Sequence, residues 1–201
     1  MPDQAVSLDG LARSILARHP YRFVLADDDA SRDVAYRLRY EAVVEHGWRD
    51  ASEMTGQRER DEYDPRAVHV IAWDHDMPVA TGRIVLPPGP LPTEEVCGIR
   101  VEPAGRVVDV GRMTVAPSHQ SAGHPLFMAL LARLYLEVRA RDHDTACGLM
   151  SPRARSLMRL LGLKLDLLGP DRPYWGEPRA PVRFSVFVNA TPPPARWPAG
   201  A

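Results

Sequence analysis

Apolar residues recur at helical spacing in four segments of the chain. In the second of these, Val34, Leu38 and Ala42 fall on one face, and either Asp29 or Ser31 can cap the start. Pro and Gly residues at the segment ends give further start and stop signals. Helices are predicted over residues 8–18, 29–45, 125–138 and 152–161.

Short runs rich in valine, isoleucine and aromatic residues lie between these helices and predict strands. The runs over residues 67–73 and 78–86 flank a polar turn and predict a hairpin. Residues 46–64 are polar and charged throughout, which predicts a long loop, and loops of this length are uncommon unless functional or disordered. Strands are predicted over residues 21–26, 67–73, 78–86, 106–115, 145–150, 163–167 and 182–188.

The elements follow the order strand, helix, loop, three strands, helix, strand, helix and two strands, which neither a Rossmann sheet nor a four-helix bundle has. We predict an α/β (α+β) fold with a central mixed, mostly antiparallel sheet and helices on both faces. One domain is expected over residues 21–189, after an N-terminal helical segment over residues 1–20. The Pro-rich tail over residues 190–201 is expected to be disordered.

The 201-residue chain has 25 Lys and Arg against 26 Asp and Glu, and a net charge of −1. This balance argues against nucleic-acid binding. No apolar run reaches the roughly 20 residues of a membrane span, and the N-terminus lacks a basic and apolar leader, so the expected location is the cytoplasm. Cys97 and Cys147 form neither a disulfide framework nor a zinc pattern, and no metal site is expected.

Four stretches of sequence point to a family. They are residues 36–48 (YRLRYEAVVEHGW), 60–64 (RDEYD), 68–86 (a hairpin containing ATGRIVL) and 108–117 (VDVGRMTVAP). In this order they resemble the autoinducer-synthase and N-acyl amino acid synthase branch of the GNAT superfamily, over residues 34–188. The resemblance implies the GNAT acyltransferase fold and transfer of an acyl group from a thioester to the amine of an amino acid or related metabolite. In the autoinducer case, the product would then cyclise to a homoserine lactone.

The resemblance also assigns roles to particular positions. The family's arginines, acids and tryptophan match Arg39, Arg83, Arg112, Asp61, Asp64, Asp109 and Trp48. Val43 and Met113 stand where the family has phenylalanine. Because both positions would line an acyl or substrate pocket, the substrate stays open.

The charged residues lie in separate segments, and several interrupt apolar runs, as Arg83 and Arg112 do. A charge that points into a core is costly unless it is paired, so opposite charges here are expected to satisfy one another. Strand alternation places Arg112 on the face of Val108 and Val110. Two interpretations remain: a structural network of ion pairs, or a network that also binds a substrate carboxylate and orients an amine.

Attack of an amine on a thioester needs a proton acceptor, for which Asp61, Glu62, Asp64 and Asp109 compete. Backbone N–H groups at a bulge near residues 111–115 can stabilise the oxyanion. An acceptor carboxylate needs a cation, for which the candidates are Arg39, Arg83 and Arg112. We assign catalysis to Asp61, Asp64, Asp109 and Arg112, and substrate binding to Arg39, Trp48, Arg83, Met113 and Thr114.

The thioester is assigned to Val115, Gln120 and Gly123. GNAT enzymes that use coenzyme A cradle its pyrophosphate on backbone N–H groups at a helix N-terminus. Only Gln120 and Gly123 fit that pattern here, and Pro125 removes an N–H from it. We therefore expect no bound cofactor and an acyl-thioester co-substrate, carried on the phosphopantetheine of an acyl carrier protein rather than on coenzyme A.

A carrier protein is acidic and docks on a basic face. Basic residues gather in the C-terminal half at Arg133, Arg139, Arg141, Arg153, Arg155, Arg159 and Lys164. The Tyr174-Trp175-Gly176 segment either covers an acyl pocket or plugs the end of the sheet. Two alternative functions remain: an acetyl-CoA-dependent GNAT N-acetyltransferase, and a GNAT-fold module that binds a metabolite without catalysis.

Overall fold

A computed structural model describes residues 8–186, except for the side chains of residues 121–124. The α-helices are α1 (Leu8–Ala17), α2 (Asp29–Glu45), α3 (Pro92–Cys97), α4 (Gly123–Ala140) and α5 (Pro152–Leu160). The strands are β1 (Arg22–Leu25), β2 (Ala67–Asp74), β3 (Met77–Val85), β4 (Val107–Val115), β5 (Thr145–Met150), β6 (Leu165–Leu167), β7 (Arg172–Tyr174) and β8 (Glu177–Ser185). The predicted tail lies outside the described residues.

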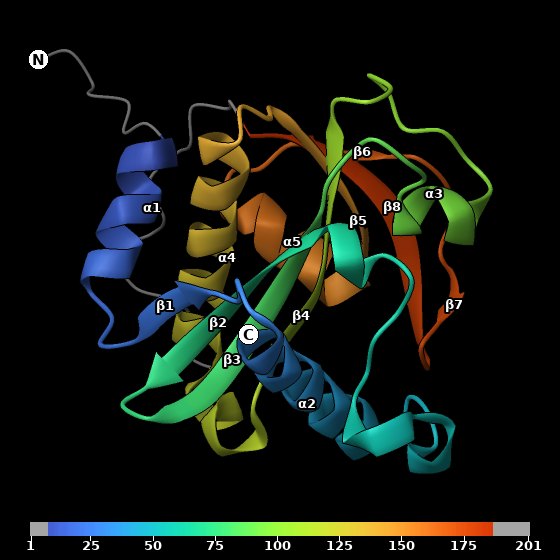
Figure 1. The fold of residues 1–201 in the computed structure, drawn as a ribbon. Helices are drawn as coiled ribbons and strands as arrows, with labels where there is room; N and C mark the ends of the chain where they lie inside the picture. The colour runs from blue at the N-terminus through green and yellow to red at the C-terminus, as the bar shows by residue number, and fades with distance from the viewer. Residues whose placement is uncertain (1–7, 187–201) are drawn as a thin grey trace, which may run out of the picture.

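The strands form a sheet in the order β1-β2-β3-β4-β5-β8-β6, and β7 pairs with β8. Among the described strands, β4 and β5 run parallel and the other neighbours run antiparallel. Helices α2 and α4 cover opposite faces (Figure 1), because Ile71 of β2 packs with α2 whereas its neighbours Val70 and Ala72 pack with α4. The predicted fold class, a mixed and mostly antiparallel sheet with helices on both faces, is confirmed.

Two elements depart from the prediction. Helix α3 follows a Pro- and Gly-rich stretch that resembles a plain connector, but Pro92 suits a first helical turn and Gly98, at φ +63°, ends the helix. Strand β7 is three residues long, contains Pro173 and pairs with β8, so its extended form depends on a partner. β8 itself begins at Glu177, five residues earlier than expected.

A β-bulge shapes the centre of the sheet. Thr81 pairs with Thr114 and Arg83 pairs with Gly111, so Arg112 and Met113 together stand opposite one β3 residue. Arg112 adopts φ +51° at this bulge. The extra residue reverses the alternation. Met113 shares the α4 face with Val108 and Val110, whereas Arg112 turns to the face of Arg83. The predicted face of Arg112 was therefore wrong.

The pairing of β4 with β5 ends early. It covers Val107 with Thr145 through Asp109 with Cys147, although both strands continue beyond these residues. A side chain at Gly148 would meet the Val110 carbonyl oxygen at 2.6 Å, so the two strands still touch just after the last pair. Beyond that point no described strand pairs with the β5 side of β4. The site described next lies beside this stretch.

Candidate active site

Arg39 enters the site from helix α2. Asp28 caps the helix by accepting a hydrogen bond from the Ser31 N–H at 2.7 Å, and the Ser31 hydroxyl side chain in turn accepts from the Asp28 N–H. The cap is thus one residue earlier than Asp29. Ala35 and Arg39 lie one turn apart on the buried face of the helix. Packing of this face on the sheet carries the guanidinium into the interior.

Two carboxylates receive that guanidinium. Nη1 and Nη2 of Arg39 donate to Oδ1 and Oδ2 of Asp64 at 2.9 and 3.1 Å, and Nε donates to Glu59. The Asp61 N–H donates to Asp64 Oδ2 at 2.8 Å, and the Tyr63 N–H donates to Asp61 Oδ1 at 3.1 Å. These backbone contacts hold the loop before β2 around the ion pair.

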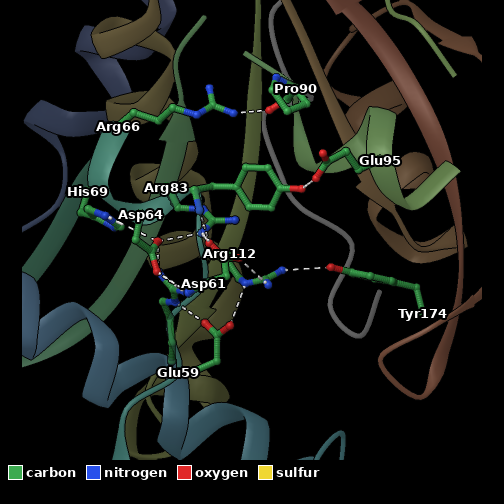
Figure 2. Close-up of polar contacts among 12 residues, drawn as sticks. Glu59, Asp61, Asp64, Arg66, His69, Arg83, Pro90, Glu95, Arg112 and Tyr174 are labelled. Atoms are coloured by element: carbon green, nitrogen blue, oxygen red, sulfur yellow. Dashed lines mark hydrogen bonds and ion pairs between the residues drawn. The ribbon is translucent and has the colours of Figure 1, made fainter. Parts of the chain in front are cut away.

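Arg83 of β3 and Arg112 of β4 reach the same acids (Figure 2). Arg83 Nη1 donates to Asp61 at 2.5 Å and to Asp64 at 2.7 Å. Arg112 Nη2 donates to Asp61 at 3.0 Å, and its Nε donates to Glu59 at 3.2 Å. Three guanidinium groups therefore face three carboxylates, which leaves no net charge. The ion-pair cluster, as we call it, consists of Arg39, Glu59, Asp61, Asp64, Arg83 and Arg112.

The cluster favours the ionised forms of Asp64 and Arg112. Burial by itself raises the pKa of Asp64, but the hydrogen bonds and charge of Arg39, with the charge of Arg83, outweigh it and bring the pKa to about 2. Burial opposes the charge of Arg112, yet Glu59, Tyr174 and Asp61 raise its pKa. Asp64 and Arg112 thus stay charged at neutral pH, and Asp64 is a poor proton acceptor.

His69 of β2 lies against the cluster without joining it. Its Nε2 is 3.7 Å from Asp64 Oδ1, beyond hydrogen-bond distance, and neither ring nitrogen has a partner among the described residues. Burial lowers its pKa to about 4, although the Asp64 charge opposes that shift. His69 is therefore neutral at pH 7 and adds no charge to the site.

An aromatic turn between β7 and β8 closes on Arg112. Tyr174 accepts a hydrogen bond from Arg112 Nη1 at 3.2 Å, and the Arg112 Cζ lies 4.1 Å from the Trp175 ring centroid. The Trp48 ring is 6.3 Å from Trp175, and Gly176 stands against it. Trp48, predicted to bind substrate, therefore belongs to an aromatic group that covers the cluster on the Tyr174 side.

Asp109 does not join the cluster, although it was grouped with the catalytic acids. Its carboxylate accepts a hydrogen bond from the Thr93 N–H of α3 at 2.8 Å, and the Cys147 Sγ lies 3.7 Å away. Burial raises its pKa, which the Thr93 contacts oppose. The side chain is enclosed between α3 and the paired part of β4 and β5. Among the described residues, no group of three or more His, Cys, Asp or Glu is placed to hold a metal ion.

The other assigned residues follow β4 and the turn after it. Met113 lies on the opposite face of the sheet from the cluster, packed in the α4 core, while Thr114 and Val115 pair with β3. Gln120 is exposed and donates to the Val115 carbonyl oxygen at 3.4 Å. Gly123 is the first residue of α4. The structure thus places these five near the end of β4 but brings none of them into the ion-pair cluster.

Glu59 is the member of the cluster that sequence reasoning missed. It is buried between Arg39 and Arg112 and lies in the polar stretch that was expected to be a loop. Counting the buried charges gives the signal that a third acid is needed. Three buried arginines need three carboxylates, and only Asp61 and Asp64 remain once Asp109 lies elsewhere.

The basic residues of the C-terminal half are largely paired with acids. Arg133 and Arg141 both pair with Glu137 along α4, and Arg139 pairs with Asp9 of α1 at 3.5 Å. Arg155 pairs with Asp171, at 2.7 Å. This surface therefore has a weaker positive field than the count of arginines indicates.

Comparison with known proteins gives a family match. A family model described as N-acyl amino acid synthase FeeM matches residues 34–182, which include the whole ion-pair cluster and the aromatic turn. The chain has no significant match among curated protein sequences.

Solved structures share the architecture. The AHL synthase LasI has a TM-score of 0.70 and 15% identity, over 83% of this chain and 90% of that one. MesI, a CoA-dependent acyl-homoserine lactone synthase, has a TM-score of 0.67 and 22% identity, over 82% and 89%. FeeM, an N-acyl amino acid synthase from uncultured soil microbes, has a TM-score of 0.59 and 16% identity, over 83% and 90%. At these identities the likeness establishes the shared fold.

Proposed function

The chain belongs to the N-acyl amino acid synthase FeeM family, and from this membership we propose that it transfers an acyl group from a thioester to the amine of an amino acid or a related metabolite. The observation that supports the proposal is the neutral ion-pair cluster beside the point where β4 and β5 cease to pair. Asp61 and Arg112 are its most exposed side chains, at 15% and 14%, so a bound substrate reaches these two first.

Asp61 is the proton acceptor in this proposal. An amine attacks only in its neutral form, so a nearby base must take a proton directly or through water. Asp64 has a pKa of about 2, and Glu59 is buried between Arg39 and Arg112. Asp109 is enclosed away from the cluster. Asp61 combines access with a fixed position, because Arg83 holds one of its oxygens and Arg112 the other.

The reaction exchanges one bond to the thioester carbonyl carbon for another. The amine nitrogen forms a bond to that carbon, the carbon–sulfur bond breaks, and the thiolate leaves with the proton that the amine gave up. The oxyanion formed on the way needs hydrogen-bond donors at its position. Backbone N–H groups of β4 at residues 111–115 serve this role in the proposal, since the β5 side of β4 has no described strand partner there.

An acyl carrier protein is the proposed donor. Pro125 in the first turn of α4 removes a backbone N–H from the place where coenzyme A enzymes bind pyrophosphate. A phosphopantetheine arm presents no such pyrophosphate to this turn. The likeness to MesI favours coenzyme A as the second candidate, because MesI is CoA-dependent. Both cysteines are free, which supports a cytoplasmic location.

Free-thiol release tests the proposal. Purified protein is incubated with acyl carrier protein thioesters, matched acyl-CoA thioesters and a panel of amino acids, and the products are identified by mass spectrometry. An N-acylated product from carrier-protein donors at a higher kcat/KM than from CoA donors supports the full proposal. A higher kcat/KM with CoA donors makes coenzyme A the donor and leaves the proposed acyl transfer unchanged. No thiol release with any pair contradicts the acyl transfer.

A further inference from the structure

The three arginines of the ion-pair cluster have little capacity left for a substrate carboxylate. All three side-chain nitrogens of Arg39 contact Glu59 or Asp64, and those of Arg112 contact Glu59, Tyr174 and Asp61. Arg83 uses only its Nη1 in these contacts, but its side chain is 2% exposed and its Nε is buried. A carboxylate added to this neutral set would have to displace an acid that is already bound.

Arg179 of β8 is in a different situation. Its Cζ lies 5.1 Å from the Trp48 ring centroid and 5.9 Å from that of Tyr174, so its guanidinium sits among the aromatic rings. The acid beside it, Glu177, lies 3.5 Å from its Nη2 and is 40% exposed. The Arg179 Nε is buried without a hydrogen-bond partner in the described part of the chain. Because this Nε is buried like that of Arg83, a ligand can reach Arg179 only at its terminal nitrogens, in a side chain that is 19% exposed and has only a loose counter-charge.

The surroundings of Arg179 favour the binding of an anion. Burial lowers its pKa, Glu177 opposes this, and the charge of Arg112 adds to the lowering. Arg112 and Arg179 both lie beside Tyr174. The acids of the ion-pair cluster balance the charge of Arg112, whereas Arg179 has only the loose contact with Glu177. A bound carboxylate would give the terminal nitrogens of Arg179 a closer counter-charge than Glu177 does.

We infer that Arg179 binds the carboxylate of the acceptor amino acid and so selects acceptors that carry a free carboxylate next to the amine. The inference rests on the proposed function, which supplies the amine acceptor. Arg112 donates hydrogen bonds to Tyr174 and to Asp61 (Figure 2), and the Arg179 Cζ lies 5.9 Å from the Tyr174 ring centroid, so the carboxylate partner and the proposed base lie on the same side of the ion-pair cluster. In this inference, the amine of an amino acid held at Arg179 by its carboxylate faces Asp61.

The test compares a carboxylate acceptor with its neutral analogue. Acylation is measured with the amino acid that the wild type acylates best and with the primary amide of that amino acid, using the better thioester donor. In Arg179→Gln, the KM for the amino acid should rise about 10- to 100-fold, because a hydrogen-bonded charge partner is lost. The KM for the amide should change less than about twofold, since the amide has no carboxylate for Arg179 to bind.

Two further variants complete the test. Arg183→Gln on the same strand removes a surface guanidinium that pairs with Asp166 at 2.8 Å, and it should leave both KM values as they are. Arg179→Lys keeps the charge but loses the planar fork, and it should raise the amino-acid KM less than Arg179→Gln does. If Arg179→Gln fails to fold, the same acceptor-selective rise in Arg179→Lys is the required result.

The outcomes separate the two proposals. Equal KM changes for both acceptors, or no change in either Arg179 variant, overturn the carboxylate role and leave acyl transfer standing. Wild-type protein that acylates the amide as efficiently as it acylates the amino acid also overturns the carboxylate role and leaves acyl transfer standing. Wild-type protein that releases no thiol with any donor and amine overturns the proposed function and this inference with it.

Discussion

Arg39 and Asp64 form a two-point ion pair in which both side chains are almost fully enclosed, at 2% and 3% exposure. The pair links helix α2 to the turn before β2 across 25 residues of sequence. Each partner also binds a second member of the cluster, because Arg39 contacts Glu59 and Asp64 contacts Arg83. Removing one charge therefore leaves several buried groups without a counter-charge.

Asp64→Asn should lower the free energy of unfolding by about 3–5 kcal/mol, the usual cost of breaking a buried ion pair from one side. Urea denaturation at pH 7 measures the change. Asp166→Asn is the matched control, since Asp166 pairs with Arg183 at the surface and should cost at most about 1 kcal/mol. Equal losses in the two variants would contradict the view that Asp64 anchors the cluster.

The sequence predicts which charges must find partners, but not which of them meet. Arginines inside apolar strands need buried acids, and the family resemblance pointed to Asp61 and Asp64 as those acids. It also led to Asp109, which instead binds the N–H of Thr93 in a helix that the sequence did not reveal. Glu59 stayed hidden because nothing in a polar loop distinguishes an enclosed acid from a solvated one.

The fold could be predicted from the sequence more fully than the site could. Hydrophobic periodicity is a local signal, whereas the direction of a side chain in an irregular strand is not. Helices α1, α2, α4 and α5 and most strands follow the hydrophobic pattern. The bulge at Arg112 cannot be read from alternation, because one inserted residue exchanges the two faces of the strand beyond it. A β4 without the bulge would have put Arg112 in the α4 core and left Glu59 and Asp61 without that partner.

The buried His69 should make the protein less stable in mild acid. Its pKa is about 4 in the folded protein, against 6.5 when unfolded, so the unfolded chain takes up a proton first as the pH falls. The stability from this residue is complete above pH 6.5 and is lost progressively down to about pH 4, by about 3 kcal/mol in total.

Urea denaturation between pH 7 and pH 4 measures this loss in the wild type and in His69→Asn. The difference in slope between the two proteins isolates the residue, whatever the variant costs at pH 7. His75→Asn is the control, because the His75 side chain is 96% exposed in the turn after β2. A wild-type slope that persists in His69→Asn would show that another group titrates in this window.

Asp61→Asn should reduce kcat by about 10²- to 10⁴-fold with an ordinary amine acceptor, the range expected for loss of a general base. Hydroxylamine is already neutral at pH 7 and needs no such base, so the variant should lose much less activity with it. Steady-state rates with both acceptors separate a proton-transfer role from structural damage, which would lower both equally.

Glu62→Gln is the control for Asp61, because Glu62 is the exposed neighbour that competed with it as proton acceptor in the sequence. It should retain the wild-type rate with both acceptors. A loss confined to the ordinary amine in Glu62→Gln, with Asp61→Asn unaffected, would move the base to Glu62.

Gly176 should be less tolerant of alanine than Gly98, although both have positive φ, at +68° and +63°. A Cβ at Gly98 meets nothing within 4 Å, so Gly98→Ala should cost only the strain of the left-handed backbone, about 1–2 kcal/mol. A Cβ at Gly176 lies 3.0 Å from Trp48 Cδ1 and must push that ring aside. Gly176→Ala should therefore lose more stability and also raise the KM for the amine acceptor, with the thioester KM unchanged.

Urea denaturation and steady-state kinetics on the two variants check both effects. If the acceptor KM stays the same while Gly176→Ala is destabilised, Trp48 supports the turn without touching substrate.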